Sequence, residues 1–512
     1  MFSFDRMNNL SGLLALVCAL AILSGCTVGP NYSRPAAETP SAYKESEGWK
    51  VAQPGDEMSR GKWWEMFGDQ RLNALQEQVV ISNQNVLLAE SNFRQARALV
   101  QAARAAYYPT VSVGVGVTRS KASATLGKQP VAPGALTIYS LPADVSWEPD
   151  IWGKVQRSVE ANRASAQASA ADLESIQLSA RAELAQDYFL LAAVDAQKQL
   201  FDATVLAYDK SLQLTKNRYA AGVASKADIV LAEAQLKTTQ AQAIDLGVQR
   251  AQLEHAIALL IGKPASDFSL PMIPLVAVAP PVPTGLPSQL LERRPDIAAA
   301  ERRVAAANAE IGVTIAAFYP TVTLGLSGGF ETSDAAKWLT MPSRFWSIGA
   351  NASQTLFDGG LRSAQTDQAR AAYDGTVATY RQTVLTGFKE VEDNLAALRI
   401  LEQEAQVQTQ AVEASLQSVT LLTNQYKAGT VSYLDVVVTQ ATALSNERTA
   451  VDILSRRLTA NILLIKALGG GWSASKLPTN EELSSDSSQS ARTPVAVAEK
   501  DSTGAAGSNN VR

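Results

Sequence analysis

The fold is decided by residues 154–221, which read KVQRSVEANRASAQASAADLESIQLSARAELAQDYFLLAAVDAQKQLFDATVLAYDKSLQLTKNRYAA. This stretch has no Pro and no Gly, and it is rich in Ala, Gln, Leu, Glu and Arg, which favour helix. One unbroken helix of this length is roughly 100 Å long, whereas an ordinary globular helix has only about 11–12 residues. A compact soluble domain cannot hold such a helix. The sequence therefore predicts a coiled coil, or a helix that bridges a distance such as the space between two membranes.

A second long helix is predicted at residues 361–428, which have a similar composition. Both stretches end in a Tyr-x-Ala-Gly turn, at Gly222 and Gly429, and each is expected to continue into a shorter helix, at 225–260 and 432–468. An internal duplication of this kind is interpreted before any other feature. Its period is too long for a solenoid, so we expect two pseudo-equivalent halves of one body.

Alternating apolar and polar residues precede each long helix, as in the TVSVGVGVT run that begins at Thr110. The expected strands are 110–119, 136–147, 321–331 and 344–357. Such alternation is typical of a transmembrane β-strand, although a half-buried strand of a soluble protein looks the same. Four strands cannot close a barrel, and lipid does not tolerate an open sheet edge. If the strands cross a membrane, several chains must share one barrel, and three copies would give twelve strands. Aromatic residues expected near the lipid headgroups are Phe330, Trp338, Phe345 and Trp346.

The N-terminus has the pattern of a bacterial lipoprotein signal. An apolar run is too short to span a bilayer comfortably and ends in Leu23-Ser24-Gly25-Cys26, a lipobox. We expect cleavage before Cys26, which then carries an S-diacylglycerol and an N-acyl lipid. Thr27 occupies the position where Asp would favour retention in the inner membrane, so outer-membrane localisation is predicted. The alternative is an ordinary secretory signal with a Cys by chance.

The predicted segments follow from these features and from composition. They are a signal peptide at 1–25, a lipidated extended arm at 26–60, a first repeat at 61–262, a Pro-rich linker at 263–287, a second repeat at 288–472 and a disordered tail at 473–512.

Several classes of function are disfavoured. The net charge is -4 and no basic stripe indicates nucleic acid. The Gly-x-Ser-x-Gly pattern at 325–329 lies in an expected strand and no His follows it, which disfavours a hydrolase. The single His255 and one lipidated Cys leave no convincing metal site. The Glu-Arg-Arg triplets that begin at Glu292 and Glu301 are expected on solvated helix faces with local ion pairs.

Several ordered motifs resemble those of one family, the TolC-like outer membrane factors, which are outer-membrane efflux lipoproteins of RND-type tripartite pumps. The motifs are VGPNY at 28–32, LERRPDI at 291–297, AERR at 300–303, ANAEIG at 307–312, FYP at 318–320, LFDGG at 356–360 and YKAG at 426–429. The resemblance covers nearly the whole mature chain up to about Leu468.

The resemblance implies a mainly α fold with a transmembrane β-barrel, made by a homotrimer. A twelve-stranded barrel in the outer membrane would continue into a periplasmic α-barrel. The implied function is passive: the duct conducts drugs or other small molecules delivered by an inner-membrane transporter through a periplasmic adaptor. No enzymatic activity and no cofactor apart from the lipid on Cys26 is implied. The alternative is a periplasmic adaptor lipoprotein, although adaptors carry one hairpin amid soluble β-domains.

By the same resemblance, the two helix–turn–helix tips form the periplasmic aperture. Its candidate residues are Asp228, Asp435, Leu434, Val438 and Tyr426, with Gly222 and Gly429 in the turns. In a trimer each Asp would form a ring of three carboxylates that attracts cations. The alternative is that each Asp only stabilises the positive end of its helix dipole. Where many members carry a second acid and some a basic residue, this chain has Val438 and Val431, so a more apolar constriction is predicted.

Overall fold

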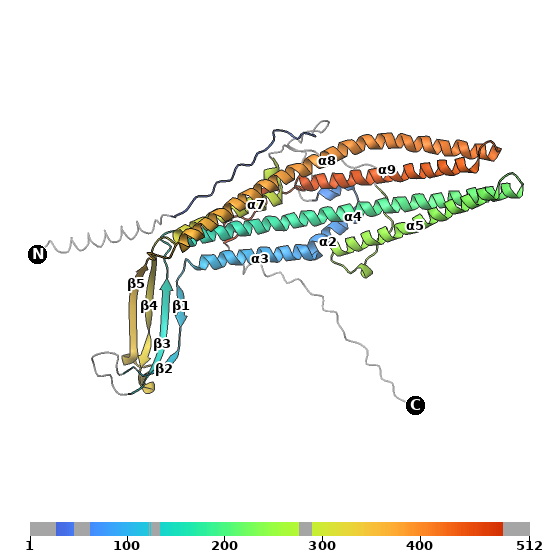
Figure 1. The fold of residues 1–512 in the computed structure, drawn as a ribbon. Coiled ribbons are helices and arrows are strands. Elements are labelled where there is room, and N and C mark those ends of the chain that lie inside the picture. Colours follow the sequence, from blue (N-terminus) through green and yellow to red (C-terminus); the bar gives the residue numbers. More distant parts are fainter. Residues whose placement is uncertain (1–26, 46–61, 122, 124–133, 276–288, 485–512) are drawn as a thin grey trace, which may run out of the picture.

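The computed structural model describes residues 27–45, 62–121, 123, 134–275 and 289–484. Cys26, the predicted signal peptide and parts of the arm, linker and tail lie outside the described residues. The described chain is an elongated layer of helices from one end of which a β-sheet projects (Figure 1). The two helical hairpins point away from the sheet, so their tips lie at the opposite end (Figure 1).

The helices form two similar sets, one in each half. The first set is η1 (Trp63–Phe67), α2 (Gln70–Ser82), α3 (Gln84–Ala105), α4 (Lys154–Ala220), α5 (Lys226–Leu260) and η2 (Ala265–Asp267). The second is α6 (Leu290–Arg293), α7 (Pro295–Ala316), η4 (Ala335–Lys337), η5 (Met341–Ser343), α8 (Leu361–Ala428), α9 (Tyr433–Ala467) and η6 (Ala474–Lys476). None of the helices in the described ranges combines the length and the apolarity needed to cross a membrane.

The helices pack closely because α4 is lined with alanine. Ala161, Ala164, Ala168 and Ala171 are buried, and α4 lies against α3, α5 and α7. Small side chains allow such neighbours to approach closely. The largest apolar cluster lies in the middle of the molecule, where α2, α4, α7, α8 and α9 meet. It includes Trp63, Trp64, Tyr188, Phe189, Tyr380 and Ile465.

The strands form one antiparallel sheet in which those of the first half lie beside those of the second half. They are β1 (Thr110–Val113), β2 (Gly116–Ser120), β3 (Leu136–Trp147), β4 (Thr321–Thr332) and β5 (Arg344–Ser353). β3 pairs with β1 and β2 on one side and with β4 on the other, and β5 pairs with β4. Among the described strands, β1 and β2 therefore share one free edge of the sheet, and β5 forms the other.

The strand expected at 110–119 is divided into β1 and β2. Both keep one register against β3, with Val113 opposite Ala143 and Gly116 opposite Ser140. Between them Gly114 donates its N–H to the carbonyl of Pro142 at 2.9 Å, but Pro142 has no N–H to return. The hydrogen-bond ladder is therefore interrupted at this point, but the register of the two strands against β3 does not shift.

The strand expected at 344–357 ends early, at Ser353. Ser353 pairs with Thr321, and the next partner along the ladder would be Pro320, which has no N–H and precedes β4. The ladder loses a donor there. The following residues instead form the connection to α8, where Asp358 accepts a hydrogen bond from the N–H of Gly360 at 3.0 Å.

The tail expected to be disordered from residue 473 is ordered as far as Ser484. We call residues 472–484 the C-terminal strap. The side chain of Leu483 is buried against Val100 of α3 and Ala166 of α4. Its carbonyl accepts a hydrogen bond from Gln101 at 3.1 Å. A buried apolar side chain and paired backbone groups thus hold a segment that its Ser-rich composition suggested would be free.

The inter-half linker is also more than a spacer over its described part. It contains η2, and the side chain of Ile273 is buried against the central core. The N–H of Ile273 donates to Asp195 of α4 at 2.9 Å, and the carbonyl of Leu270 accepts from Arg250 of α5 at 2.7 Å. The linker is therefore bound across the base of the first hairpin.

Candidate functional site

The two hairpin tips have the same local construction. Gly222 and Gly429 adopt positive φ angles of 74° and 81°, which an L side chain rarely adopts. Ser225 and Ser432 then start α5 and α9 with capping boxes. The duplication is thus preserved at the tips in the residues that the turn geometry requires.

Asp228 and Asp435 are the acidic partners in these capping boxes. Asp228 accepts a hydrogen bond from the N–H of Ser225 at 2.9 Å, and Asp435 accepts one from the N–H of Ser432 at 3.1 Å. Asp435 also accepts from the Ser432 hydroxyl at 2.7 Å. Both carboxylates therefore satisfy backbone donors at a helix N-terminus, where negative charge is favoured. Asp228 is half-buried and Asp435 is exposed.

Leu434 and Val438 lie one helical turn apart on α9, and their side chains are 55% and 56% exposed. The adjacent Tyr433 and Val436 are buried, so α9 directs one face to the other helices and another away from them. Asp435 lies on the exposed face. An acidic group and two apolar groups are thus presented together at the tip.

Tyr426, by contrast, is buried between the two hairpins. Its ring centroid lies 5.3 Å from that of Tyr433, and the Arg218 guanidinium lies 4.6 Å from its centroid. The Tyr426 hydroxyl donates to Thr215 at 3.5 Å. Tyr426 therefore joins the second hairpin to α4 of the first.

Two further hydrogen bonds connect the hairpins at this point. The Arg218 Nη1 donates to the carbonyl of Lys427 at 2.9 Å, and the hydroxyls of Ser211 and Tyr433 are 3.2 Å apart. Burial raises the pKa of the Tyr433 phenol further above physiological pH. We call Ser211, Thr215, Arg218, Tyr426 and Tyr433 the tip cluster.

Of these five residues, the sequence interpretation named only Tyr426. Ser211, Thr215 and Arg218 follow one another at steps of four and three, which places them on one face of α4. This spacing was a usable signal. Nothing in the sequence indicated which helix that face would meet.

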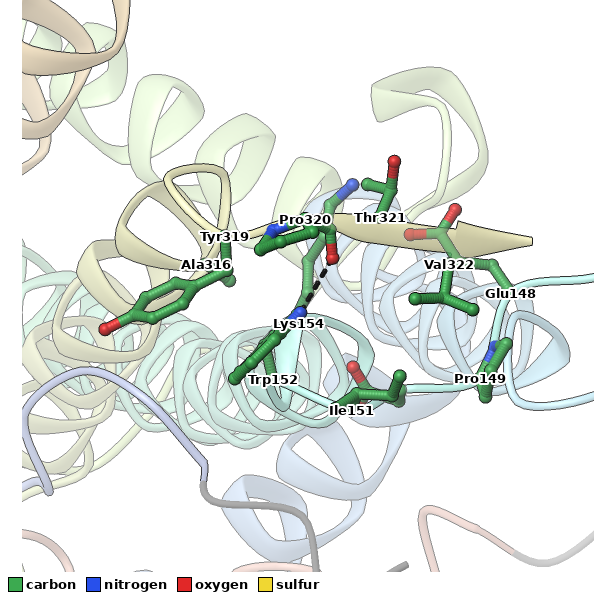
Figure 2. A pocket seen from close by; sticks show the side chains of 11 residues that line it. Glu148, Pro149, Ile151, Trp152, Lys154, Ala316, Tyr319, Pro320, Thr321 and Val322 are labelled. Carbon is green, nitrogen blue, oxygen red and sulfur yellow. Dashed lines mark hydrogen bonds between the residues drawn. The ribbon is translucent and has the colours of Figure 1, made fainter. Parts of the chain in front are cut away.

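A second feature lies where the strands join the helices (Figure 2). The Trp152 indole donates to the carbonyl of Pro320 at 2.7 Å, and the Trp152 and Tyr319 rings stack with centroids 4.8 Å apart. Trp152 lies between β3 and α4, and Tyr319 and Pro320 lie between α7 and β4. These contacts tie the strand-to-helix junction of the first half to the helix-to-strand junction of the second half.

Aromatic side chains flank both ends of the sheet. At the junction they are Tyr107, Tyr108, Trp147, Trp152, Phe318 and Tyr319. At the far end Tyr139 and Trp338 pack at 5.6 Å, near the predicted Phe330, Phe345 and Trp346. The twelve residues of β3 extend roughly 40 Å, enough to cross the apolar band of about 25 Å of an outer-membrane barrel when tilted by about 45°. The Val side chains at 111, 113, 115 and 117 are exposed, as expected of a face toward lipid.

The described chain begins beside this junction. The N–H of Val28 donates to the carbonyl of Trp152 at 3.2 Å, and Thr27 packs against Gly153. Cys26 itself lies outside the described residues, but its neighbour is placed at the level of the junction aromatic residues.

The structure also places the two sequence features that could have indicated a hydrolase or a metal site. Gly325–Gly329 lies within β4, and His255 is exposed on α5. Within the described ranges, His, Cys, Asp and Glu side chains form no group suited to a metal ion.

The expectation of solvated Glu-Arg-Arg triplets was wrong for two members. Arg294 is buried, donates to Asp296 at 2.7 Å and Glu390 at 2.7 Å, and joins α7 to α8. Glu301 is buried and accepts hydrogen bonds from Tyr32 and Arg302. Arg294 and Glu301 do form the expected ion pairs. However, both side chains are buried and link separate segments of the chain instead of facing water.

Comparison with known proteins gives consistent similarities. The sequence profile described as outer membrane efflux protein matches residues 75–263 and 286–470. The chain is 29% identical to the pyoverdine export outer membrane protein OpmQ of Pseudomonas aeruginosa, over 90% of this chain and 98% of that protein. It is 31% identical to the toluene efflux pump outer membrane protein TtgF of Pseudomonas putida, over 89% and 96%. The solved outer-membrane channel OprN superposes with a TM-score of 0.81 at 29% identity, covering 87% of this chain and 100% of OprN.

Proposed function

The chain belongs to the outer membrane efflux protein family, and from this we propose that three copies form the passive exit duct of a tripartite efflux pump. The duct crosses the outer membrane and extends into the periplasm. It conducts drugs or other small molecules that an inner-membrane transporter of the RND type delivers through a periplasmic adaptor. The family consists of outer membrane efflux proteins, which favours this role over that of the adaptor itself.

The observation that carries the proposal is the open sheet. Its aromatic flanks and exposed apolar face suit a membrane, yet β1, β2 and β5 leave both described edges without a partner strand. Unpaired backbone groups are costly in lipid, so these edges must pair with other copies of the chain. Three copies of this four-wide sheet close a twelve-stranded barrel that opens into the α-barrel of the long helices.

The lipid anchor is part of the same proposal. The lipobox places S-diacylglycerol and N-acyl chains on Cys26. Thr27 lies at the junction beside Trp152 and Gly153, which supports entry of the acyl chains into the periplasmic leaflet.

The hairpin tips form the gate at the periplasmic end. The tip cluster holds the hairpins of one copy together, while Leu434, Asp435 and Val438 remain exposed for the constriction. Asp228 and Asp435 each give a ring of three carboxylates in the trimer, which attracts cations. Leu434 and Val438 narrow the passage with apolar groups that disfavour water.

Single-channel recordings in planar bilayers test the gate. Asp435→Asn keeps an oxygen that can cap α9 but removes the charge, so the preference for cations should fall several-fold. Asp245→Asn, an exposed acid of α5 away from the tips, is the matched control and should leave the preference unchanged. Equal ion selectivity in both variants would exclude the carboxylate ring, and absence of any conductance both in the wild-type trimer and in Arg218→Ala, whose tip contacts are weakened, would exclude the duct.

A further inference from the structure

The beginning of the described arm, residues 27–31, is bound to the body along its length. The Thr27 hydroxyl donates to Gln156 at 3.0 Å, and the N–H of Val28 donates to Trp152. The carbonyl of Pro30 accepts from Asn308 of α7 at 3.0 Å. The arm therefore lies across α4 and α7, where the helices begin to leave the sheet.

Arg157 makes the largest share of these contacts. Its Nε donates to the carbonyl of Val28 at 3.2 Å, and its Nη2 donates to the carbonyl of Gly29 at 3.2 Å and to Asn31 at 2.9 Å. Its Nη1 donates to Glu160 at 2.8 Å. Arg157 is only 3% exposed. A guanidinium is tolerated at such a position only when its donors are satisfied, and here the arm provides three of the four acceptors.

The arm also packs so closely against α7 that two positions in the contact have no room for a side chain. Gly29 has a φ of +93°, and a Cβ at this position would lie 2.5 Å from the Cα of Gly312 on α7. A Cβ on Gly312 would in turn lie 2.8 Å from the Cγ of Arg157. The arm is thus seated in a groove formed by the absence of two side chains and closed by the guanidinium.

We propose that Arg157 is a positioning residue that fixes the acylated N-terminus at the junction of sheet and helices. The consequence for the lipid rests on the proposed acylation of Cys26, whereas the docking of residues 27–31 does not. The arm then acts as a docked peptide that sets the depth of the protein relative to its own acyl chains.

The alternative arrangement would be a free tether. If residues 26–45 were a flexible chain, the acyl group would wander over roughly 25 Å, close to the hydrocarbon thickness of about 30 Å. Docking at residue 27 removes nearly all of this freedom. An anchor with a fixed exit point holds the sheet level with the bilayer, which a free tether does not.

Hydrogen exchange of the intact trimer, followed by mass spectrometry of the arm peptide, tests the proposal. Arg157→Met leaves three arm acceptors without their donor, so exchange at the Val28 amide should rise at least tenfold. The matched control is Arg163→Met on the same helix, whose side chain donates to Ser484 of the strap at 2.9 Å. This control should leave the arm as protected as in the wild type.

A second variant approaches the contact from the arm. Gly29→Ala should release the arm to a similar extent, while exchange within α4 and α7 stays unchanged. That pattern separates loss of docking from general destabilisation. An arm that remains protected in both Arg157→Met and Gly29→Ala would overturn the proposal.

The unlipidated variant Cys26→Ser, exported with an ordinary secretory signal in place of residues 1–25 so that its leader is still removed, separates this inference from the proposed function. If Arg157 does the positioning, the arm of Cys26→Ser stays as protected as the wild-type arm. If its exchange rises tenfold, the lipid holds the arm and the proposal is wrong. A wild-type mass without acyl chains would contradict the lipid anchor of the proposed function, while the exchange data would still decide the role of Arg157 in docking.

Discussion

The first hairpin, α4 and α5, and the second, α8 and α9, are equivalent at their tips but differ at their bases. The tip glycines lie 207 positions apart, and the same shift relates two ion pairs, Asp195–Arg250 and Glu402–Arg457. The Asp195 side chain is fully buried and that of Arg250 is 24% exposed. The corresponding values for Glu402 and Arg457 are 50% and 21%.

The difference comes from the segment that follows each hairpin. After α5 the linker turns back over the ion pair, and the N–H of Ile273 donates to Asp195. After α9 the strap leaves toward α3, so Glu402 is not covered in this way. The ion pair is thus part of a buried network in the first half only. The duplicated sequence places an ion pair at the same position in both hairpins. The segment that follows each hairpin then decides whether the pair is buried.

The largest expected effect comes from removing the buried partner. Asp195→Ala leaves Arg250 without its buried carboxylate and the N–H of Ile273 without an acceptor. The free energy of local opening around Ile273, measured by hydrogen exchange, should fall by about 3 kcal/mol. The paired variant Glu402→Ala should change the opening around Arg457 by less than about 1 kcal/mol. Similar losses in both halves would show that the linker does not create the difference.

The contact between the hairpins gives the next effect. Arg218→Ala removes a hydrogen bond to the Lys427 carbonyl and a cation–π contact with Tyr426. Contact between the tips should weaken by about 1–2 kcal/mol, and single-channel recordings should show more frequent open events. Lys216→Ala, an exposed cation near the same tip, serves as the control. An unchanged open fraction in Arg218→Ala would mean that the tip cluster does not hold the closed state.

The two halves also differ at one position where only the first half has a titratable side chain, so its contribution to stability depends on pH. Burial, with a contribution from Glu183, raises the pKa of Asp187 to about 6. The equivalent residue of the second half is Asn394, which cannot titrate. Because the folded state binds the proton more tightly than the unfolded state, the free energy of unfolding of the wild type falls as pH rises from about 4 to about 6 and is constant above that.

The variant Asp187→Asn makes the first half resemble the second at this point. It should be more stable than the wild type by about 1–2 kcal/mol at pH 8, a value reduced for partial exposure, and should show no advantage below pH 4. Thermal unfolding at a series of pH values measures this. A constant difference across that range would mean that the Asp187 carboxyl does not titrate as described.

The smallest expected effects are equal in the two halves. Ser225→Ala and Ser432→Ala each remove a capping hydroxyl, and each should destabilise its own hairpin by about 1 kcal/mol. Hydrogen exchange in the first turns of α5 and α9 measures both. If the two substitutions changed the exchange rates by clearly different amounts, the two tips would not be equivalent.

Much of the fold was predictable because its signals are local. The absence of Pro and Gly over 154–221 predicted the helix that the structure places at Lys154–Ala220. Gly222 and Gly429 marked the tips, since their turns need positive φ. The ordered motifs predicted the family, and the comparisons confirmed it.

The rest depended on contacts between distant residues. Asp195 and Ile273 are 78 positions apart, and neither reveals the other in the sequence. The strap was assigned to a disordered tail on its composition, whereas the burial of Leu483 and the hydrogen bond from Gln101 depend on contacts with distant helices. Arg294 was expected in water because a charged residue is normally exposed, and two of its acceptors, Glu390 and the carbonyl of Ala467, lie on other helices.

The central claim is that three copies share one barrel, and electron-microscope imaging of the detergent-purified protein tests it most directly. The 67 residues of α4 alone extend roughly 100 Å, so we predict a particle with three-fold symmetry that is well over about 100 Å long. Its sheet end should show a closed barrel in which β5 of one copy pairs with the free edge of the next. A monomer, or a compact particle whose sheet edges remain open, would contradict the account.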